Sequence, residues 1–319
     1  MEKELIYKMK MVLCYCQELQ IAGGDPEGIA EFWENLKLQG VVIRRIPKRQ
    51  GEQDILKQIC QHKNAVSRQD DRNIVGEFAK EEILVIAATD ETIREAMEAG
   101  VAVFAWKNPD YQEESLMASP FLVESFEGVD YEYVERIWRR FHKLPWNILT
   151  TSRCYVRELT MEDLEDLFYM YQQEGMTKYM EPLYERDDEM EYQKAYIENM
   201  YGFYGYGMWL VFDQVTDALI GRAGIENREL HGTYELELGY AITPAYQRKG
   251  YATEVCQGIL VYAREHLEAR EINCLIQKEN YPSLALAKKL GFCYLETIEL
   301  EKQLYERYVY TLSEENKSE

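Results

Sequence analysis

Two continuous apolar runs, joined by one helical segment, constrain the fold of the N-terminal half more than any other feature. Residues 83–88 and residues 101–106 are entirely apolar, as in strands that are buried on both faces of a sheet. Between them, Thr89 or Asp90 can cap the start of a helix, and Gly100 can end it. Strand, helix and strand in succession predict a parallel sheet with helices on both faces.

The rest of the first half continues this alternation. The predicted elements are strands at 9–16 and 41–43 and helices at 29–36, 55–59 and 131–141. Pro26 suits a first helical turn, and Gly40 can close the helix that it starts. Pro145 disfavours helix in the residue before it, which places a domain boundary near 145–152. We therefore predict a Rossmann-like parallel-sheet domain over residues 1–146.

The second half has a different arrangement, in which several strands follow one another directly. Its predicted strands are at 154–157, 208–212, 219–225, 234–242 and 272–277, with two more at the end, and its helices are at 161–174, 187–201, 252–267 and 283–290. Thr160 with Asp163 three residues later is a helix-start pattern of the capping-box kind. These elements predict a second domain over 152–313, followed by a polar tail at 314–319.

The chain is strongly acidic. Its 319 residues carry a formal net charge of −21, and the sequence pI is about 4.8. Such a surface repels phosphate backbones, so binding to nucleic acid is not expected. The same field favours a cationic acceptor such as an amine, although acidic charge can equally serve only to keep a protein soluble.

Cysteines, histidines and apolar runs define the compartment that we expect. The seven cysteines show no Cys-x-x-Cys spacing, and the four histidines are far apart, so we expect no metal site and a reducing compartment. No apolar run approaches the roughly 18 residues that a membrane span needs. The N-terminus lacks the basic and apolar regions of a signal peptide. We expect a cytoplasmic protein without membrane contact, and we leave its oligomeric state open.

The turn at residues 247–253 carries the strongest functional signal. A strand over 235–242 leads into it and a helix follows, so the first N–H groups of that helix are unpaired and point at a common place. Helix N-termini of this kind bind phosphates, because they also carry about half a positive charge. Gly250 allows a ligand to approach the backbone, and Arg248 and Lys249 add positive charge. Taken alone, the fragment is also compatible with an ordinary capped helix.

Three sequence blocks around this turn resemble the GCN5-related N-acetyltransferase (GNAT) superfamily. Residues 247–252 have the family's cofactor-loop pattern Gln-x-x-Gly-x-Ala, and residues 280–283 (Asn-x-x-Ser) with 290–292 (Leu-Gly-Phe) match its next block. The strand at 237–244 is similar to the branch that acetylates the N-termini of ribosomal proteins. The resemblance covers about residues 152–312 and implies a mixed-sheet α+β domain of GNAT fold. It also implies transfer of acetyl from acetyl-CoA to a primary amine, by direct attack in a ternary complex.

The resemblance further implies where acetyl-CoA binds, without a metal. The pantetheine arm would enter between splayed strands at 236–242 and 272–277 and pair with exposed backbone, and the diphosphate would bind the turn. The residues implied to bind acetyl-CoA are Tyr240, Ala241, Ile242, Gln247, Arg248, Lys249, Gly250, Tyr251, Ala252, Thr253, Asn280 and Ser283. Asn280 and Ser283 can instead form a plain helix N-cap pair.

The acceptor amine needs a base, because an ammonium with a pKa near 10.4 is neutral in only about one molecule in two thousand at pH 7. Glu235 and Glu237 are two residues apart on one strand and therefore share a face. The resemblance favours Glu237 first and Glu235 second as the base, and both can also be solvated strand carboxylates. Many family members have a tyrosine as proton donor at the position of Ala287, so the usual general acid is missing here unless Tyr281 or another tyrosine reaches the sulfur.

The acceptor pocket of the family lies against the first two helices. The residues implied to line it are Glu181, Tyr204 and Tyr206, unless these aromatic side chains only pack against the core.

Three functions stay open at this point. The first is an N-acetyltransferase acting on a small-molecule or peptide amine, and the second is a non-catalytic acyl-CoA-binding or sensing protein. The third is a bifunctional protein, because residues 83–103 weakly resemble a haloacid-dehalogenase-like Rossmannoid domain in which Asp90 is the acid nearest to the metal-binding position. The strand at 9–16 lacks the nucleophilic Asp of those enzymes, which disfavours phosphatase chemistry and leaves a scaffold, a ligand sensor or a wall of the acceptor site.

Overall fold

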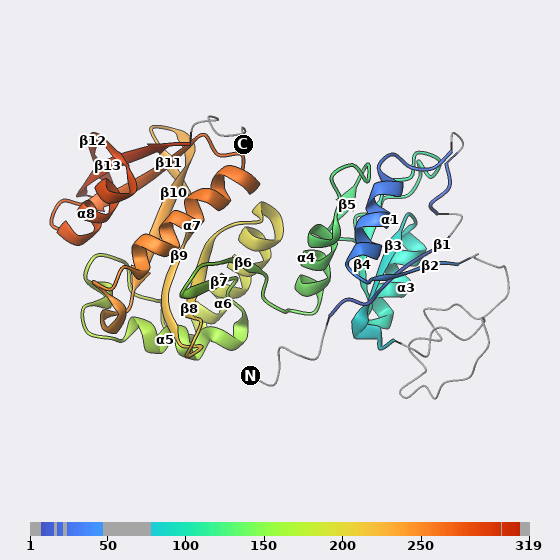
Figure 1. The fold of residues 1–319 in the computed structure, drawn as a ribbon, viewed down its shortest axis with the longest axis horizontal. Coiled ribbons are helices and arrows are strands. Elements are labelled where there is room, and N and C mark those ends of the chain that lie inside the picture. Colours follow the sequence, from blue (N-terminus) through green and yellow to red (C-terminus); the bar gives the residue numbers. More distant parts are fainter. Residues whose placement is uncertain (1–7, 16–17, 22–23, 47–77, 301, 313–319) are drawn as a thin grey trace. The chain divides into compact units, whose positions relative to one another are not determined.

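The structure, a computed structural model, describes residues 8–15, 18–21, 24–46, 78–300 and 302–312. The chain divides into two compact units, Met1–Leu144 and Pro145–Glu319, called unit 1 and unit 2 below (Figure 1). The helix expected at 55–59, the last residue of the strand expected at 9–16 and the polar tail expected at 314–319 lie outside the described residues.

Unit 1 contains a parallel sheet of five strands in the order β2-β1-β3-β4-β5. The strands are β1 (Met11–Tyr15), β2 (Val42–Ile46), β3 (Ile83–Ala87), β4 (Ala102–Trp106) and β5 (Leu122–Val123). All four neighbouring pairs run parallel. β2 lies on one side of β1, and β3 to β5 follow on the other side, so the strand order reverses between β1 and β3. Ligands commonly bind at this position in sheets of this kind.

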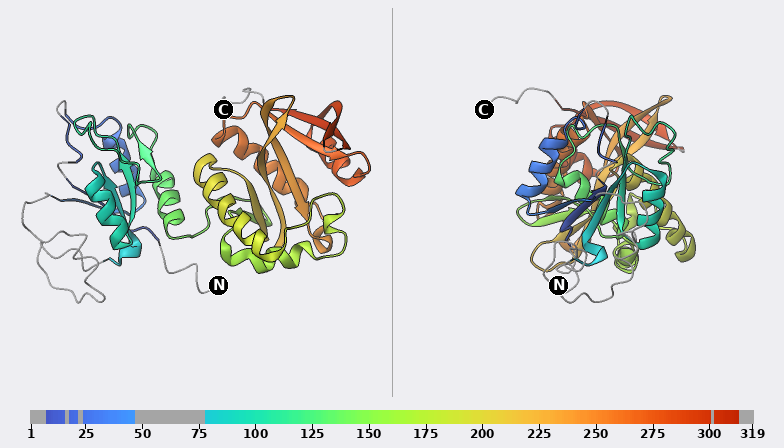
Figure 2. Two further views of the ribbon diagram at one scale, coloured as in Figure 1. Left: turned by 180° about the vertical axis from the view of Figure 1, so that it is seen from behind. Right: turned by 90° about the vertical axis from the view of Figure 1, so that its right-hand side faces the viewer.

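Helices cover both faces of this sheet (Figure 2). They are α1 (Ile29–Leu38), α3 (Asp90–Ala99) and α4 (Tyr131–Phe141), with a 3-10 turn η2 at Lys80–Glu82. Because successive strand residues point to opposite faces, Val12 and Leu84 pack in the cluster that includes α1 and α4, whereas Leu13 and Val85 pack with α3. The Thr89 side chain caps α3. The predicted parallel sheet with helices on both faces is confirmed.

Gly28, at the start of α1, is a position where unit 1 has no room for a side chain. A Cβ there would lie 2.3 Å from the backbone nitrogen of Glu127 and 2.4 Å from the backbone carbon of Phe126. Gly40 has the same φ of +76° but open space around it. Comparing an alanine substitution at Gly28 with one at Gly40 therefore separates the cost of a backbone clash from the cost of a left-handed conformation.

We expect Gly28→Ala to lower the free energy of unfolding of unit 1 by about 3 to 5 kcal/mol, and Gly40→Ala by only about 1 to 2 kcal/mol. Hydrogen exchange of unit 1 peptides in the full-length protein, followed by mass spectrometry, measures both values. Equal losses in the two variants would contradict the clash at Gly28.

Unit 2 is built on one mixed sheet of eight strands in the order β12-β13-β11-β10-β9-β8-β7-β6. The strands are β6 (Asn147–Thr150), β7 (Cys154–Arg157), β8 (Met208–Asp213), β9 (Leu219–Leu230), β10 (Thr233–Ile242), β11 (Glu271–Gln277), β12 (Cys293–Leu300) and β13 (Gln303–Thr311). Every neighbouring pair is antiparallel except β10 with β11. The mixed sheet confirms the predicted fold class. β9 continues past the expected end at 225. The prediction was too short because residues 226–229 (Glu-Asn-Arg-Glu) carry no apolar signal.

The helices of unit 2 lie close to their predicted positions. They are α5 (Leu164–Tyr171), α6 (Arg186–Tyr196), α7 (Tyr251–His266) and α8 (Tyr281–Leu290), with 3-10 turns η3 (Met161–Asp163), η4 (Met176–Lys178) and η6 (Pro244–Tyr246). The expected capping box of Thr160 and Asp163 is present at η3. The helix expected at 187–201 becomes a π-helix, η5 (Ile197–Tyr204), after α6. Such segments are frequent at functional sites.

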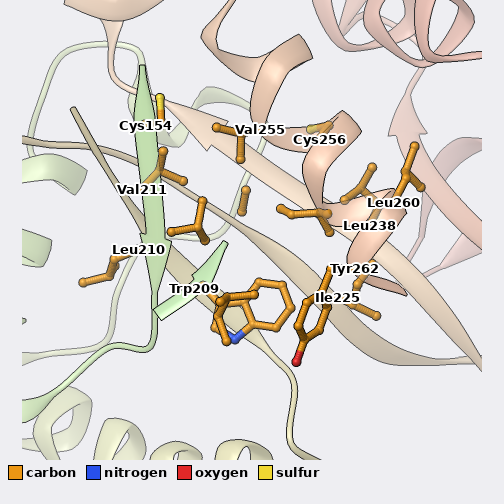
Figure 3. Close-up of a cluster of buried hydrophobic side chains, with 14 of the residues drawn as sticks. Cys154, Trp209, Leu210, Val211, Ile225, Leu238, Val255, Cys256, Leu260 and Tyr262 are labelled. Carbon is orange, nitrogen blue, oxygen red and sulfur yellow. The ribbon is translucent and has the colours of Figure 1, made fainter. Parts of the chain in front are cut away.

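The core of unit 2 lies between the sheet and α7 (Figure 3). Trp209 of β8 is fully buried, and its ring centroid lies 5.3 Å from that of Tyr262 on α7. Ile225 and Leu238 are also buried and face each other across β9 and β10. Because strand residues alternate, the next residues along β9 and β10 point to the opposite face, where the charged side chains gather.

Candidate active site

The turn before α7 has the backbone geometry of an anion-binding site. Gly250 has a φ of +86° and Arg248 a φ of +58°, so the chain turns sharply before Tyr251 begins the helix. No side chain caps this helix. The N–H of Glu254 donates to the Gly250 carbonyl at 3.1 Å, which leaves the N–H groups of the preceding helical residues without an intrahelical acceptor. A diphosphate is a natural acceptor for such groups.

Arg153 braces this turn, and the sequence reasoning missed it. Its Nε donates to Glu254 at 2.7 Å, and its Nη1 donates to the Lys249 carbonyl at 2.9 Å. The guanidinium also lies over the Tyr251 ring, 4.2 Å from its centroid. Arg153 is thus a third cation at the turn, in addition to Arg248 and Lys249. No local pattern links Arg153 to a turn about 100 residues away, so only the fold could reveal it.

Glu254 is held as an anion inside the first turn of α7. Burial alone would raise the pKa of its carboxyl, but hydrogen bonds from Thr151, Ser152 and Arg153 lower the pKa to about 2. Ser152 Oγ donates at 2.8 Å and the Arg153 backbone N–H at 2.9 Å. Since this carboxylate is neutralised by Arg153, it does not cancel the positive end of the helix.

The remaining predicted residues of the turn hold the loop or face outward. Gln247 Nε2 donates to the Ile242 carbonyl at 2.8 Å and so ties the turn to the end of β10. The hydroxyl of Tyr251 donates to Asp213 at 3.1 Å. Thr253 Oγ1 lies 3.5 Å from the ammonium of Lys289, a second cation that sequence reasoning did not place here. Ala252 is half-buried.

Strands β10 and β11 are joined at one point and separate beyond it. The pair Glu237 with Asn273 is the one register pair between these two fully described strands. Past it, the Cys274 thiol donates to the Leu238 carbonyl at 3.4 Å. The facing edge of β10 from Gly239 onward therefore keeps backbone groups that β11 does not pair. Tyr240, Ala241 and Ile242, the residues expected to meet the pantetheine arm, lie on this stretch.

Asn280 is the N-cap of α8. Its Oδ1 accepts the backbone N–H of Ser283 at 3.4 Å, and the Ser283 carbonyl accepts the hydroxyl of Tyr240 at 3.3 Å. The N-cap alternative that the sequence left open is therefore present. It occupies the oxygen of Asn280 and not its amide nitrogen, so a role of Asn280 in acetyl-CoA binding stays a prediction.

Glu237 is the carboxylate at the point where β10 and β11 meet. Arg228 Nε donates to it at 2.6 Å, and 13 % of the Glu237 side chain is exposed. Burial raises the pKa of Glu237, and the positive charge of Arg228 opposes this rise. Such an acid is closer to neutrality at physiological pH than an ordinary glutamate, which suits a proton acceptor.

Glu235, the second predicted base, is held in an ion-pair network. Arg307 Nη2 donates to it at 2.5 Å and Asn273 Nδ2 at 2.8 Å. Arg307 is only 8 % exposed and also donates to Glu296 and to Asn273. Both hydrogen bonds go to Oε2 of Glu235, so the network holds this carboxylate in place while its other oxygen can still accept a hydrogen bond.

Glu226 and Tyr196 are polar neighbours of Glu237 that the sequence did not reveal. Glu226 of β9 stands directly opposite Glu237 of β10, so two carboxylates share one face of the sheet. Like charges in this arrangement destabilise a sheet. Tyr196 of α6 donates to Glu226 at 2.8 Å and accepts the Met208 N–H at 2.6 Å. Arg228 offsets part of this cost through its ion pair with Glu237, and the second carboxylate leaves a negative charge that favours a cation.

Two of the three residues expected to line the acceptor pocket lie together, since the ring centroids of Tyr204 and Tyr206 are 5.8 Å apart. Glu181 is exposed, in the segment between η4 and α6. Tyr204 ends the π-helix with 48 % of its surface exposed. Tyr206 donates to Asn227 of β9 at 2.8 Å, and Asn227 is on the face of the sheet opposite to Glu226. Ala287 is fully buried in the core, so its position offers no proton donor.

Unit 1 contains a buried carboxylate at the end of its central strands. Glu18 is 2 % exposed and accepts the Ala88 N–H at 2.6 Å and the Thr92 hydroxyl at 2.5 Å, at the start of α3. Glu18 thus takes the place that an anionic ligand would occupy at this helix N-terminus. Asp90 accepts the N–H groups of Ser115 and Leu116, so its oxygens serve the loop.

Two general features of the described residues complete the picture. Within residues 8–15, 18–21, 24–46, 78–300 and 302–312, no helix combines the length and apolar character that crossing a membrane requires, and no cluster of three or more His, Cys, Asp or Glu side chains could hold a metal ion. Of the described cysteines, Cys154, Cys256, Cys274 and Cys293 form no disulfide.

Comparison with known proteins concerns the region that contains this site. Residues 153–293 match the family model of the acetyltransferase (GNAT) domain. The uncharacterized N-acetyltransferase YnaD of Bacillus subtilis (strain 168) is 27% identical over 172 residues, 52% of this chain and 97% of that protein. The uncharacterized N-acetyltransferase YoaA of the same organism is 28% identical over 151 residues, 46% of this chain and 82% of that protein.

Solved structures with a similar fold include two acetyltransferases. One is spermidine N-acetyltransferase from Vibrio cholerae in complex with CoA and spermine, with a TM-score of 0.41, 24% identity, and coverage of 50% of this chain and 96% of that chain. The other is an acetyltransferase (GNAT family) from Bacillus anthracis, with a TM-score of 0.42, 22% identity, and coverage of 51% and 96%.

Proposed function

Because residues 153–293 form an acetyltransferase (GNAT) domain, we propose that this protein transfers acetyl from acetyl-CoA to a primary amine by direct attack in a ternary complex. One observation supports this proposal most: the unpaired edge of β10 lies beside the uncapped N-terminus of α7. An extended arm with amide groups suits the first feature, and a diphosphate suits the second. Acetyl-CoA carries both.

The residues present fit the donor substrate. The N–H groups at the start of α7, with Arg248 and Lys249, would hold the diphosphate, while Arg153 fixes the loop that presents them. The backbone of Tyr240 to Ile242 would pair with the amides of the arm. Bound acetyl-CoA would supply an activated thioester: the amine nitrogen would bond to its acyl carbon, the C–S bond would break, and the departing CoA thiolate would take up the proton that the new amide nitrogen releases.

Glu237 is the residue that we propose as the base. It would take a proton from the acceptor ammonium, directly or through a water, and its raised pKa keeps it suited to that task near neutral pH. The positive charge of Arg228 favours the ionised form of this carboxylate. Glu235 is the less suitable of the two predicted residues because Arg307 and Asn273 hold its carboxylate in place. Glu226 would form part of the wall that receives the amine.

The function is tested by the release of free CoA thiol from acetyl-CoA, measured across a panel of amines that includes peptides, polyamines, amino sugars and amino acids. We expect thiol release that depends on one amine class, together with thermal stabilisation by CoA. A ligand at 100 times its Kd stabilises a protein by about 2.7 kcal/mol, so CoA should raise the Tm of unit 2 clearly. Absence of any stabilisation by CoA would overturn the proposal. Stabilisation without turnover of any amine would replace it with a binding role.

A further inference from the structure

Arg222 of β9 is a buried cation without a counterion. It is 8 % exposed, and among the described residues no carboxylate forms an ion pair with it. Its Nη1 lies 3.4 Å from the hydroxyl of Tyr171, and its Nε has no hydrogen-bond partner. A guanidinium cannot lose its charge inside a protein, so this charge is present in the folded chain.

The contrast with Arg307 shows how unusual this arrangement is. Arg307 is equally buried, but Glu235, Glu296 and Asn273 accept its hydrogen bonds. A buried charge without such partners is strongly unfavourable. A folded protein tolerates such a charge where a ligand supplies the missing partner, and buried polar groups left unsatisfied mark candidate sites for this reason.

Arg222 lies on the face of the sheet that carries the acidic pair. It stands opposite Ala241 of β10, while Glu226 of the same strand stands opposite Glu237. Gly224 and Gly239 form the pair between them, and the Met208 side chain of β8 lies over Gly239, since a Cβ there would meet Met208 Sδ at 2.8 Å. Ala241 belongs to the stretch proposed to meet the pantetheine arm. The guanidinium therefore belongs to the same site as the proposed base.

Tyr196 connects the positive and the negative end of this face. The Arg222 guanidinium carbon lies 5.7 Å from the centroid of the Tyr196 ring, and the Tyr196 hydroxyl donates to Glu226 at 2.8 Å. Tyr196 thus contacts both charged groups, the guanidinium through its ring and the carboxylate through its hydroxyl. A molecule with a carboxylate at one end and an amine at the other is complementary in charge to the two ends of this face.

We infer that the acceptor is a zwitterionic amino acid whose carboxylate binds the Arg222 guanidinium while its amine faces Glu226 and Glu237. This inference rests on the proposed acetyl transfer and narrows its acceptor class. A guanidinium and a carboxylate form charge-assisted hydrogen bonds, the strongest kind available here. A polyamine, which carries cations at both ends, would place like charge against Arg222.

The test uses matched acceptors with the full-length protein. Each set contains an amino acid, its carboxamide and its decarboxylated amine, and both α- and ω-amino acids are included. We expect wild-type kcat/KM to be at least about 10-fold higher for the carboxylate member. Arg222→Met should remove this preference through a KM increase of about 10- to 100-fold, and should leave the decarboxylated amine unchanged. Arg222→Lys should retain part of the preference.

Arg264→Met is the matched control, because Arg264 is an exposed residue near the end of α7 that pairs with Glu265. It should behave as the wild type. CoA affinity reports whether each variant is folded. Binding of N-acetylated amino acids to the protein–CoA complex, measured by calorimetry, gives an answer that does not depend on turnover, and it should be weaker for Arg222→Met.

Two results would overturn the inference while leaving acetyl transfer intact. One is a wild-type enzyme that acetylates the decarboxylated amine as well as the amino acid. The other is an Arg222→Met variant that loses kcat equally with every acceptor, since Arg222 would then act on the thioester or on the fold. Absence of CoA binding in the wild type would instead overturn the proposed function itself.

Discussion

Replacing Gly250 with valine is expected to abolish CoA binding, with a loss of affinity of more than about 100-fold. Gly250 has a φ of +86°, a conformation that costs an ordinary residue about 1 to 2 kcal/mol and a β-branched residue more. A Cβ at this position would also lie 3.4 Å from Arg153 Nη2, so a larger side chain would disturb the guanidinium that braces the turn. The branches of valine would stand where the diphosphate should approach the helix N-terminus.

Gly232 provides a matched control in the same unit. It has a φ of +83° in the turn between β9 and β10, and a Cβ there would meet nothing within 4 Å. Gly232→Val should therefore lower stability through the same backbone strain and keep the affinity for CoA. Calorimetric titration with CoA compares the two variants. If Gly250→Val binds CoA as tightly as the wild type does, the turn is not the diphosphate site.

Glu237→Gln is expected to lower kcat by about 10²- to 10⁴-fold and to leave CoA affinity unchanged, because the amide cannot accept the proton of the ammonium. The same role predicts a pH dependence. The carboxylate must be ionised to act, so wild-type kcat/KM should fall as the pH drops through the raised pKa of Glu237. Removing the positive charge of Arg228 should raise this pKa further, so Arg228→Met should move the acid limb to higher pH.

Glu229→Gln is the control for loss of one carboxylate from this hairpin, since Glu229 is exposed on β9 and stands opposite Tyr234. Its turnover and pH profile should match those of the wild type. Turnover of Glu237→Gln at the wild-type rate would remove Glu237 from the mechanism. An acid limb that does not move in Arg228→Met would show that a different group sets it.

The regular elements of this chain could be predicted because their signals are local. The apolar runs at 83–88 and 101–106 identify buried strands, and the Thr160 capping box marks a helix start within three residues. The extension of β9 past 225 was missed because its residues are charged and pair with the equally polar start of β10. Propensity is a weak guide where cross-strand pairing decides the conformation.

The candidate site was only partly predictable because its parts come from distant segments. The turn at 247–253 and the strand before it form one continuous signal. Arg153, Glu226 and Arg222 have no motif of their own, and only the strand register brings Glu226 opposite Glu237. A buried arginine with no carboxylate partner among the described residues likewise cannot be recognised until the burial and neighbours of each residue are known.

The single register pair between β10 and β11 also limits how far a ligand could extend between these two strands. The strands meet at Glu237 and Asn273 and diverge from there, so the gap between them is a fork with a closed end. An arm laid along β10 from Ile242 can advance only as far as that end, where the proposed base stands. The distance from the turn at 247–253 to this closed end would therefore limit the size of the acyl group. A bulkier acyl group would keep its carbonyl from reaching the amine.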